Sequence, residues 1–229
     1  MTYILAFDTT LGACSVALLQ DGNILSSKKE VRARGHVERL LPMVDEVIND
    51  AGIKLETVDL IAVTIGPGTF AGVRIGLSAA KGMALALDVP VIPVTSLEAI
   101  AFAAFRDNDV LENVNICIDA RRGEFYMQSF QSDMTRLNEA EAVPLADIEN
   151  RQYPNAPFVG SGGKMIAKII EIDQDENHEQ YDSPHAENIA LYAYQIIDKV
   201  TNADTIKPLY LRAPDAKPPS ASLVPEIKS

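Results

Sequence analysis

A glycine-rich turn carries the clearest chemical signal in the sequence. Residues 66–76 read Gly-Pro-Gly-Thr-Phe-Ala-Gly-Val-Arg-Ile-Gly and join an apolar strand pattern at 60–65 to an apolar helix pattern from about 71 to 87. The glycines on either side of Pro67 allow a sharp turn, and Thr69 is placed to cap the helix. Free N–H groups at such a helix start can bind an anion. A tight turn without a ligand explains the same residues, so both interpretations stay open.

The helix after this turn carries a row of small residues. Gly72, Gly76, Ala80 and Ala84 recur every fourth position, which places them on one face and lets another backbone approach closely. Apolar residues also occupy most of the remaining circumference. A helix that covers one sheet needs a single apolar stripe, so we expect another helix or another protein to cover a second side.

A second helix is predicted from residue 36 to about 51, where apolar residues recur at the spacing of an amphipathic helix. Pro42 should kink this helix or mark its true start. Apolar surface left uncovered on the two helices would bind a partner, or a second copy of the chain across a two-fold axis. The predicted interface comprises His36, Leu40, Leu41, Met43, Val44, Val47, Gly72, Ile75, Gly76, Ala79, Ala80 and Met83.

Composition limits the classes of function. The 229 residues are 47% apolar and 23% charged, as in an ordinary globular protein, and the net charge of −12 argues against direct binding of nucleic acid. The two cysteines, Cys14 and Cys117, fall inside predicted strands, which is typical of buried thiols in a reducing compartment. We see no signal peptide and no membrane-spanning run, so we expect a cytoplasmic protein with no membrane contact.

Features of the first half recur in the same order in the second half. A strand ends at Asp8 with Gly12 four residues later, and another ends at Asp119 with Gly123 four residues later. Residues 157–163 then mirror the first glycine-rich turn. We interpret this as two related subdomains. The alternative is two unrelated sheets that both use Asp-turn-Gly hairpins.

The order of the predicted elements indicates an α/β fold. Three antiparallel strands are followed by parallel crossovers, which gives a mixed sheet flanked by helices in each subdomain. We predict an N-terminal, partner-binding subdomain at 1–105, a smaller C-terminal subdomain at 106–212, and a mobile proline-rich tail at 213–229.

These features resemble the actin, sugar kinase and Hsp70 superfamily, whose subdomains are of the actin-like or ribonuclease H-like type. More narrowly, four motifs are similar to those of the bacterial TsaB (YeaZ) family. They are Gly66 to Gly76, His36-Val-Glu-Arg-Leu-Leu-Pro42, Asp119-Ala-Arg-Arg-Gly-Glu-Phe-Tyr126 and Pro208-Leu-Tyr-Leu-Arg212.

The resemblance implies a non-catalytic scaffold or activator subunit. Such a subunit is required for the threonylcarbamoyl modification of the tRNA adenosine next to the anticodon. It would act by forming a heterodimer with the catalytic paralogue TsaD, with the ATPase TsaE joining the assembly and tRNA reached only through the complex. Alone, the chain is expected to form a homodimer.

The superfamily resemblance also points to a nucleotide site. Its members hold phosphates, Mg²⁺ and adenosine at positions that correspond to Asp8, Thr9, Thr10, Gly12, Asp119, Gly123, Gly160, Gly162 and Gly163. Any such site would be vestigial and would bind ATP or ADP weakly or only in the complex, so no cofactor is firmly predicted. The alternative, which we favour, is that these are inherited turn residues in a site that has largely closed.

The sequence departs from the catalytic paralogue at a motif around His36, where that paralogue carries a metal-binding H-x-x-x-H. Here Leu40 stands four residues after His36, and one imidazole alone cannot share a metal across a helical turn. We therefore predict no metal site and no catalytic residue. The alternative is a stand-alone small ATP-dependent kinase or hydrolase, which needs a general base near Asp8 and bound Mg²⁺. A metalloprotease would need the missing histidine or a catalytic triad.

Overall fold

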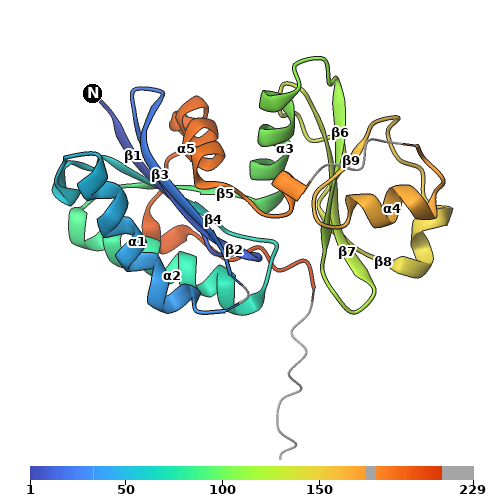
Figure 1. The fold of residues 1–229 in the computed structure, drawn as a ribbon, viewed down its shortest axis with the longest axis horizontal. Coiled ribbons are helices and arrows are strands. Elements are labelled where there is room, and N and C mark those ends of the chain that lie inside the picture. Colours follow the sequence, from blue (N-terminus) through green and yellow to red (C-terminus); the bar gives the residue numbers. More distant parts are fainter. Residues whose placement is uncertain (33, 174–178, 213–229) are drawn as a thin grey trace, which may run out of the picture.

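The computed structural model describes residues 1–32, 34–173 and 179–212, which form two lobes around two sheets (Figure 1). The strand order is β3-β2-β1-β4-β5 in the first sheet and β8-β7-β6-β9 in the second. The predicted tail at 213–229 lies outside the described residues.

The first sheet is mixed, as predicted. Strands β1 (Tyr3–Asp8), β2 (Ala13–Gln20) and β3 (Asn23–Val31) form an antiparallel meander, and β4 (Leu60–Thr64) and β5 (Val91–Val94) add parallel strands beside β1. Strands β1, β2, β4 and β5 are near-continuous apolar runs because helices cover both faces of the sheet, whereas the edge strand β3 is largely polar.

The second sheet repeats this plan. Strand β6 (Asn113–Asp119) pairs antiparallel with β7 (Glu124–Gln131), which pairs with β8 (Glu141–Pro144), and β9 (Phe158–Val159) runs parallel to β6. In both sheets the first strand lies between its hairpin partner and a parallel strand that leads through a glycine turn into a helix. The duplication predicted from the sequence is therefore confirmed.

Helices α1 (His36–Asp50) and α2 (Phe70–Leu87) cover one face of the first sheet (Figure 1). Helix α1 runs through Pro42, so this proline does not mark its start. The predicted cap is confirmed, because the Thr69 hydroxyl accepts a hydrogen bond from the Gly72 N–H at 3.1 Å.

The opposite face of the first sheet is covered by α3 (Ser96–Asp107) and α5 (Ala186–Gln195). Helix α3 also packs against the second sheet and so lies between the two. The sequence division had placed residues 186–195 in the second subdomain. In the structure the chain returns after the second sheet, and α5 contacts β1 and β2 of the first lobe. Helix α4 (Gly163–Ile169) and a 3₁₀ turn (Leu145–Asn150) complete the reduced second lobe.

The small-residue row of α2 faces the first sheet and its hairpin turn, not a partner. A Cβ at Gly72 would lie 2.1 Å from the Thr9 carbonyl oxygen, and one at Gly76 would lie 2.9 Å from Thr9 Oγ1. Ala80 and Ala84 are buried in the same core. By length and composition α2 is apolar enough to span a membrane, but the structure uses this buried stripe to cover a sheet.

Two glycine substitutions in α2 should have opposite effects. Gly72→Ala should lower the free energy of unfolding by about 1–3 kcal/mol, because the added methyl overlaps the Thr9 carbonyl. Gly82→Ala should raise it by about 0.5–1 kcal/mol, because nothing lies within 4 Å of its Cβ position and alanine favours the helix. Urea unfolding checks both values. Equal effects would contradict the close approach of α2.

Candidate functional site

An apolar groove runs between α1 and α2 on the surface of the first lobe. This helix groove has a volume of about 440 Å³. Two of its side chains, Val37 and Leu41, are 63% and 53% exposed, which is high for large apolar residues. Its lining residues are Val37, Leu40, Leu41, Arg74, Ile75, Ser78 and Ala79.

The structure shows which residues of the predicted partner interface are accessible at the groove and which are buried. Leu41, Ile75 and Ala79 line it, and His36 and Met83 are partly exposed. Leu40 forms its floor but is only 1% exposed. The other six predicted residues are buried in the first lobe: Met43, Val44, Val47, Gly72, Gly76 and Ala80.

The burial of these six residues has a physical cause. The apolar stripe of an amphipathic helix is the stripe that its own sheet covers, so the exposed apolar groove lies on the flanks of the stripe. Val37, Arg74 and Ser78 also line the groove and were not selected from the sequence for this reason. The signal that could have found Val37 was an apolar residue one helical turn from Leu41 on the same flank.

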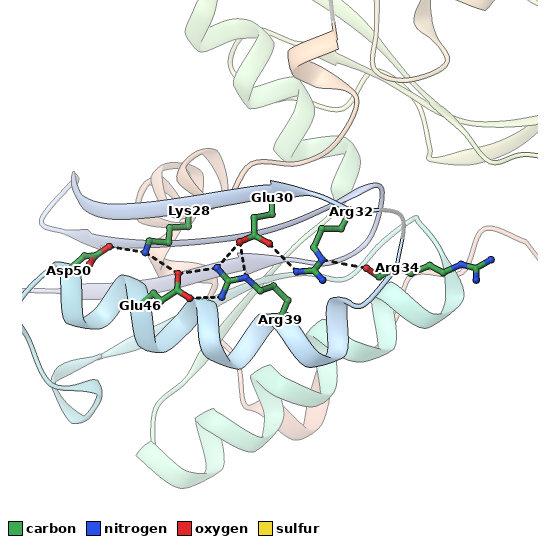
Figure 2. A network of polar contacts seen from close by, with 7 residues as sticks. All are labelled: Lys28, Glu30, Arg32, Arg34, Arg39, Glu46 and Asp50. Atoms are coloured by element: carbon green, nitrogen blue, oxygen red, sulfur yellow. Dashed lines mark hydrogen bonds and ion pairs between the residues drawn. The ribbon is translucent and has the colours of Figure 1, made fainter.

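Helix α1 is fastened to β3 by a chain of ion pairs (Figure 2). Arg39 donates to both Glu46 oxygens at 2.6 and 2.9 Å and to Glu30 Oε1 at 2.8 Å. Lys28 lies 2.9 Å from Glu46 and 3.1 Å from Asp50. Hydrogen bonds from Arg39, then from Lys28, lower the pKa of Glu46 to about 2. The network holds α1 beside the sheet and so positions one wall of the helix groove.

A second cavity, of about 490 Å³, lies between the lobes. The first lobe contributes Gly12, Gly68 and Thr69, and the second contributes Asp119 and Ser161. The structure therefore brings together Gly12 and Asp119, two residues that the superfamily resemblance assigned to one site. This interlobe cavity is also lined by Leu11, Lys29, Val31, Ala120, Arg121, Tyr126, Asp182 and Ser183.

Asp8 lies behind this cavity and is not among its lining residues. Its Oδ1 accepts hydrogen bonds from the Thr10 N–H at 3.1 Å, the Thr10 hydroxyl at 2.6 Å and the Thr64 hydroxyl. Its Oδ2 is buried without a hydrogen-bond partner among the described residues. Burial raises the pKa of the Asp8 carboxyl, against the opposing effect of these donors. Thr9 is occupied as well, since its hydroxyl donates to the Gly72 carbonyl at 2.7 Å.

The glycines expected to admit a nucleotide serve packing inside the second lobe. A Cβ at Gly160 would lie 2.6 Å from the Cys117 carbonyl oxygen, and one at Gly163 would lie 2.5 Å from that of Phe158. A Cβ at Gly162 would meet the Phe125 ring at 2.6 Å. Gly123 has φ of 75° and forms the β6–β7 hairpin turn. Ser161, which the sequence analysis did not select, is the member of this turn that lines the cavity.

His36 and Leu40 occupy different environments on α1. His36 is partly buried at the helix start, whereas Leu40 points into the core and is 1% exposed. Within the described ranges, no group of three or more His, Cys, Asp or Glu side chains is arranged to hold a metal ion.

Comparison with known proteins gives consistent matches. Residues 22–217 match the family described as TsaD, tRNA N6-adenosine threonylcarbamoyltransferase. The chain is 38% identical over 180 residues to the tRNA threonylcarbamoyladenosine biosynthesis protein TsaB of Haemophilus influenzae, covering 73% of this chain and 75% of the relative. It is 41% identical over 164 residues to TsaB of Escherichia coli, covering 69% and 70%. The solved structure of YeaZ from Pseudomonas aeruginosa superposes with a TM-score of 0.77 at 34% identity, covering 92% of this chain and 100% of that one.

The buried Asp8 carboxyl should make stability depend on pH. Because its pKa is raised in the folded state, ionisation costs stability as the pH rises from the unfolded value near 3.8 through the folded value. Asp8→Asn cannot ionise, so its stability relative to the parent should increase with pH across that window and then level off. Urea unfolding at a series of pH values measures the difference. A constant difference would show that the carboxyl is not desolvated.

Proposed function

Because this chain belongs to the TsaB family of tRNA threonylcarbamoyladenosine biosynthesis proteins, within the wider TsaD family, we propose that it is a non-catalytic subunit that acts by binding a TsaD paralogue. Its role lies in the biosynthesis of threonylcarbamoyladenosine in tRNA. The actin-like α/β fold and the family resemblance predicted from the motifs are confirmed. The subunit role and the partner are our proposal.

The helix groove is the observation on which the proposal rests. It exposes large apolar side chains on two neighbouring helices, a surface that favours burial against a protein. A paralogue of the same fold would present corresponding helices, so the two grooves can pack against each other. In the absence of the paralogue, a second copy of the chain takes its place through the same surface. TsaE would join the assembled complex.

The charge of the chain supports indirect contact with tRNA. At a net charge of −12 the chain repels phosphates, so a partner must supply the cations that bind the RNA. The buried free thiols Cys14 and Cys117 fit a reducing compartment, and we place the protein in the cytoplasm.

Two features support a non-catalytic role over a stand-alone kinase or hydrolase. The position that would carry the second metal-binding histidine is Leu40, a core residue. The Asp8 carboxylate lies behind the cavity wall, and one of its oxygens is saturated by threonine donors. A kinase needs this carboxylate accessible to a metal or to the substrate.

Binding of ATP or ADP is a separate proposal for the interlobe cavity. Its Lys29 and Arg121 side chains could balance phosphate charge, and the unpartnered Asp8 Oδ2 lies behind the same wall. Against a tight site, Asp119 and Asp182 add negative charge to the lining. The mixed lining favours weak binding, or binding that is completed only within the complex.

Leu41→Asp should weaken association with TsaD about tenfold or more, because it places an unpaired charge in the helix groove. The same substitution should also weaken self-association of the chain. Sedimentation velocity of the chain alone and mixed with TsaD measures both.

Leu145→Asp is the matched control, since Leu145 is a similarly exposed leucine, 42% against 53% for Leu41, in the second lobe. It should leave both associations unchanged. The shared surface would be refuted if Leu41→Asp bound TsaD as well as the parent, or if the homodimer persisted intact inside the complex with TsaD.

The isolated chain should release phosphate from ATP no faster than a blank. A coupled assay on purified protein, with and without Mg²⁺, tests this directly. Turnover above the blank that disappears in Asp8→Ala would favour the kinase or hydrolase alternative.

A further inference from the structure

The segment after α5 connects the two lobes. Residues 206–212, which we call the strap, begin at Ile206 in the core of the first lobe. The Leu209 N–H donates to the Ile65 carbonyl at 2.8 Å, at the end of β4. A Cβ at Gly66 would lie 2.9 Å from the Leu209 carbonyl oxygen, so the strap lies tightly on the glycine-rich turn. Leu211 then packs against the cluster that α3 forms with the second sheet.

The middle of the strap is held by a side chain that also lines the helix groove. Tyr210 stacks on Phe70 with ring centroids 5.4 Å apart and planes 25° apart. The Arg74 guanidinium carbon lies 3.8 Å from the centre of the Phe70 ring, and its Nε donates to the Tyr210 hydroxyl at 3.2 Å. Arg74 is therefore both a wall of the groove and an anchor of the strap.

The end of the strap is held by the second lobe. Arg212 Nε lies 3.1 Å from Glu124 Oε2, and its Nη1 donates to the Ala120 carbonyl at 3.4 Å. Ala120 lines the interlobe cavity. Figure 1 shows α3 and the chain leading into the tail at opposite ends of the junction between the lobes. If the strap were released, the lobes would thus stay joined through α3. There Arg136 pairs with Glu98 at 2.7 Å.

We propose that the strap is a latch that couples the helix groove to the interlobe cavity. A protein seated in the groove contacts Arg74, holds the Arg74–Tyr210 contact closed, and so fixes the Arg212 anchor and the angle between the lobes. The anchors are suited to switching, because each is a partly exposed contact of modest strength. The coupling to a partner rests on the proposed function, whereas the latch itself is a property of the chain alone.

The distance between the lobes in the isolated full-length chain tests the latch. Spin labels can be attached at Glu56→Cys in the first lobe and Glu149→Cys in the second, both exposed positions, since the native Cys14 and Cys117 are buried. Double electron–electron resonance should give one narrow distance peak for the parent. Arg212→Ala and Arg74→Ala should both broaden this peak or shift it.

Matched controls distinguish the effect of releasing the strap from the effect of removing any arginine or lysine side chain. Arg151→Ala removes an ion pair to Glu141 inside the second lobe, and Lys81→Ala removes a cation from α2 that does not line the helix groove. Both should keep the parental peak. The latch is refuted if Arg212→Ala keeps the parental peak, if Arg74→Ala keeps it, or if the controls broaden it equally. Thermal unfolding of each variant shows whether it is still folded, which separates release of the strap from misfolding. A variant that is unfolded is replaced by Tyr210→Phe. This substitution keeps the aromatic stack on Phe70 and removes the hydrogen bond from Arg74.

Addition of purified TsaD separates the two proposals. TsaD should narrow any broadened peak of Tyr210→Phe, which keeps both Arg74 and Arg212. It should not narrow the peak of Arg212→Ala, which lacks the anchor on the second lobe. Binding of TsaD without this difference refutes the coupling and leaves the proposed function standing. Failure of TsaD to bind any variant or the parent refutes the proposed function, and the measurements on the chain alone still decide the latch.

Discussion

The close approach of α2 to the turn between β1 and β2 is the constraint on which the first lobe depends. Cβ positions at Gly68 and Gly72 would lie 2.4 Å from the Thr10 carbonyl oxygen and 2.1 Å from that of Thr9, so any side chain there would force the backbone to shift. The Thr69 N–H then donates to the Thr10 carbonyl at 2.8 Å. This contact closes the end of the sheet over Asp8 and leaves its carboxylate out of the interlobe cavity.

The same contact sets the position of the helix groove. Because the small face of α2 is used against the sheet, its flank carrying Arg74, Ile75 and Ala79 turns toward α1. The ion pairs of Arg39 draw α1 toward β3 and complete the opposite wall. An apolar surface is thus created by two independent constraints, one steric and one electrostatic, that do not themselves involve a partner.

The two lobes share a topology but differ at the corresponding strand ends. Asp8 is fully buried and bonded by threonines, whereas Asp119 is exposed and lines the cavity, where its Oδ1 accepts from the Arg121 N–H at 2.7 Å. The glycine turn of the second lobe packs on its own strands. The two halves of the duplicated plan therefore present different groups at the cavity, a buried carboxylate in the first lobe and an exposed one in the second.

By itself the sequence determined the α/β fold, the duplication and the Thr69 cap, because local periodicity, turn residues and repeated motifs carry that information. It also predicted that α1 and α2 carry apolar surface beyond what one sheet covers. Only the tertiary structure decided which faces of those helices are free, since periodicity cannot distinguish a stripe covered by the chain's own sheet from one left for a partner. The return of α5 to the first lobe and the strap contacts of Tyr210 and Arg212 were likewise beyond the sequence. The contacts of α5 and of Tyr210 join residues more than a hundred positions apart in the sequence, and those of Arg212 join residues more than eighty positions apart. No local sequence pattern records contacts at such separations.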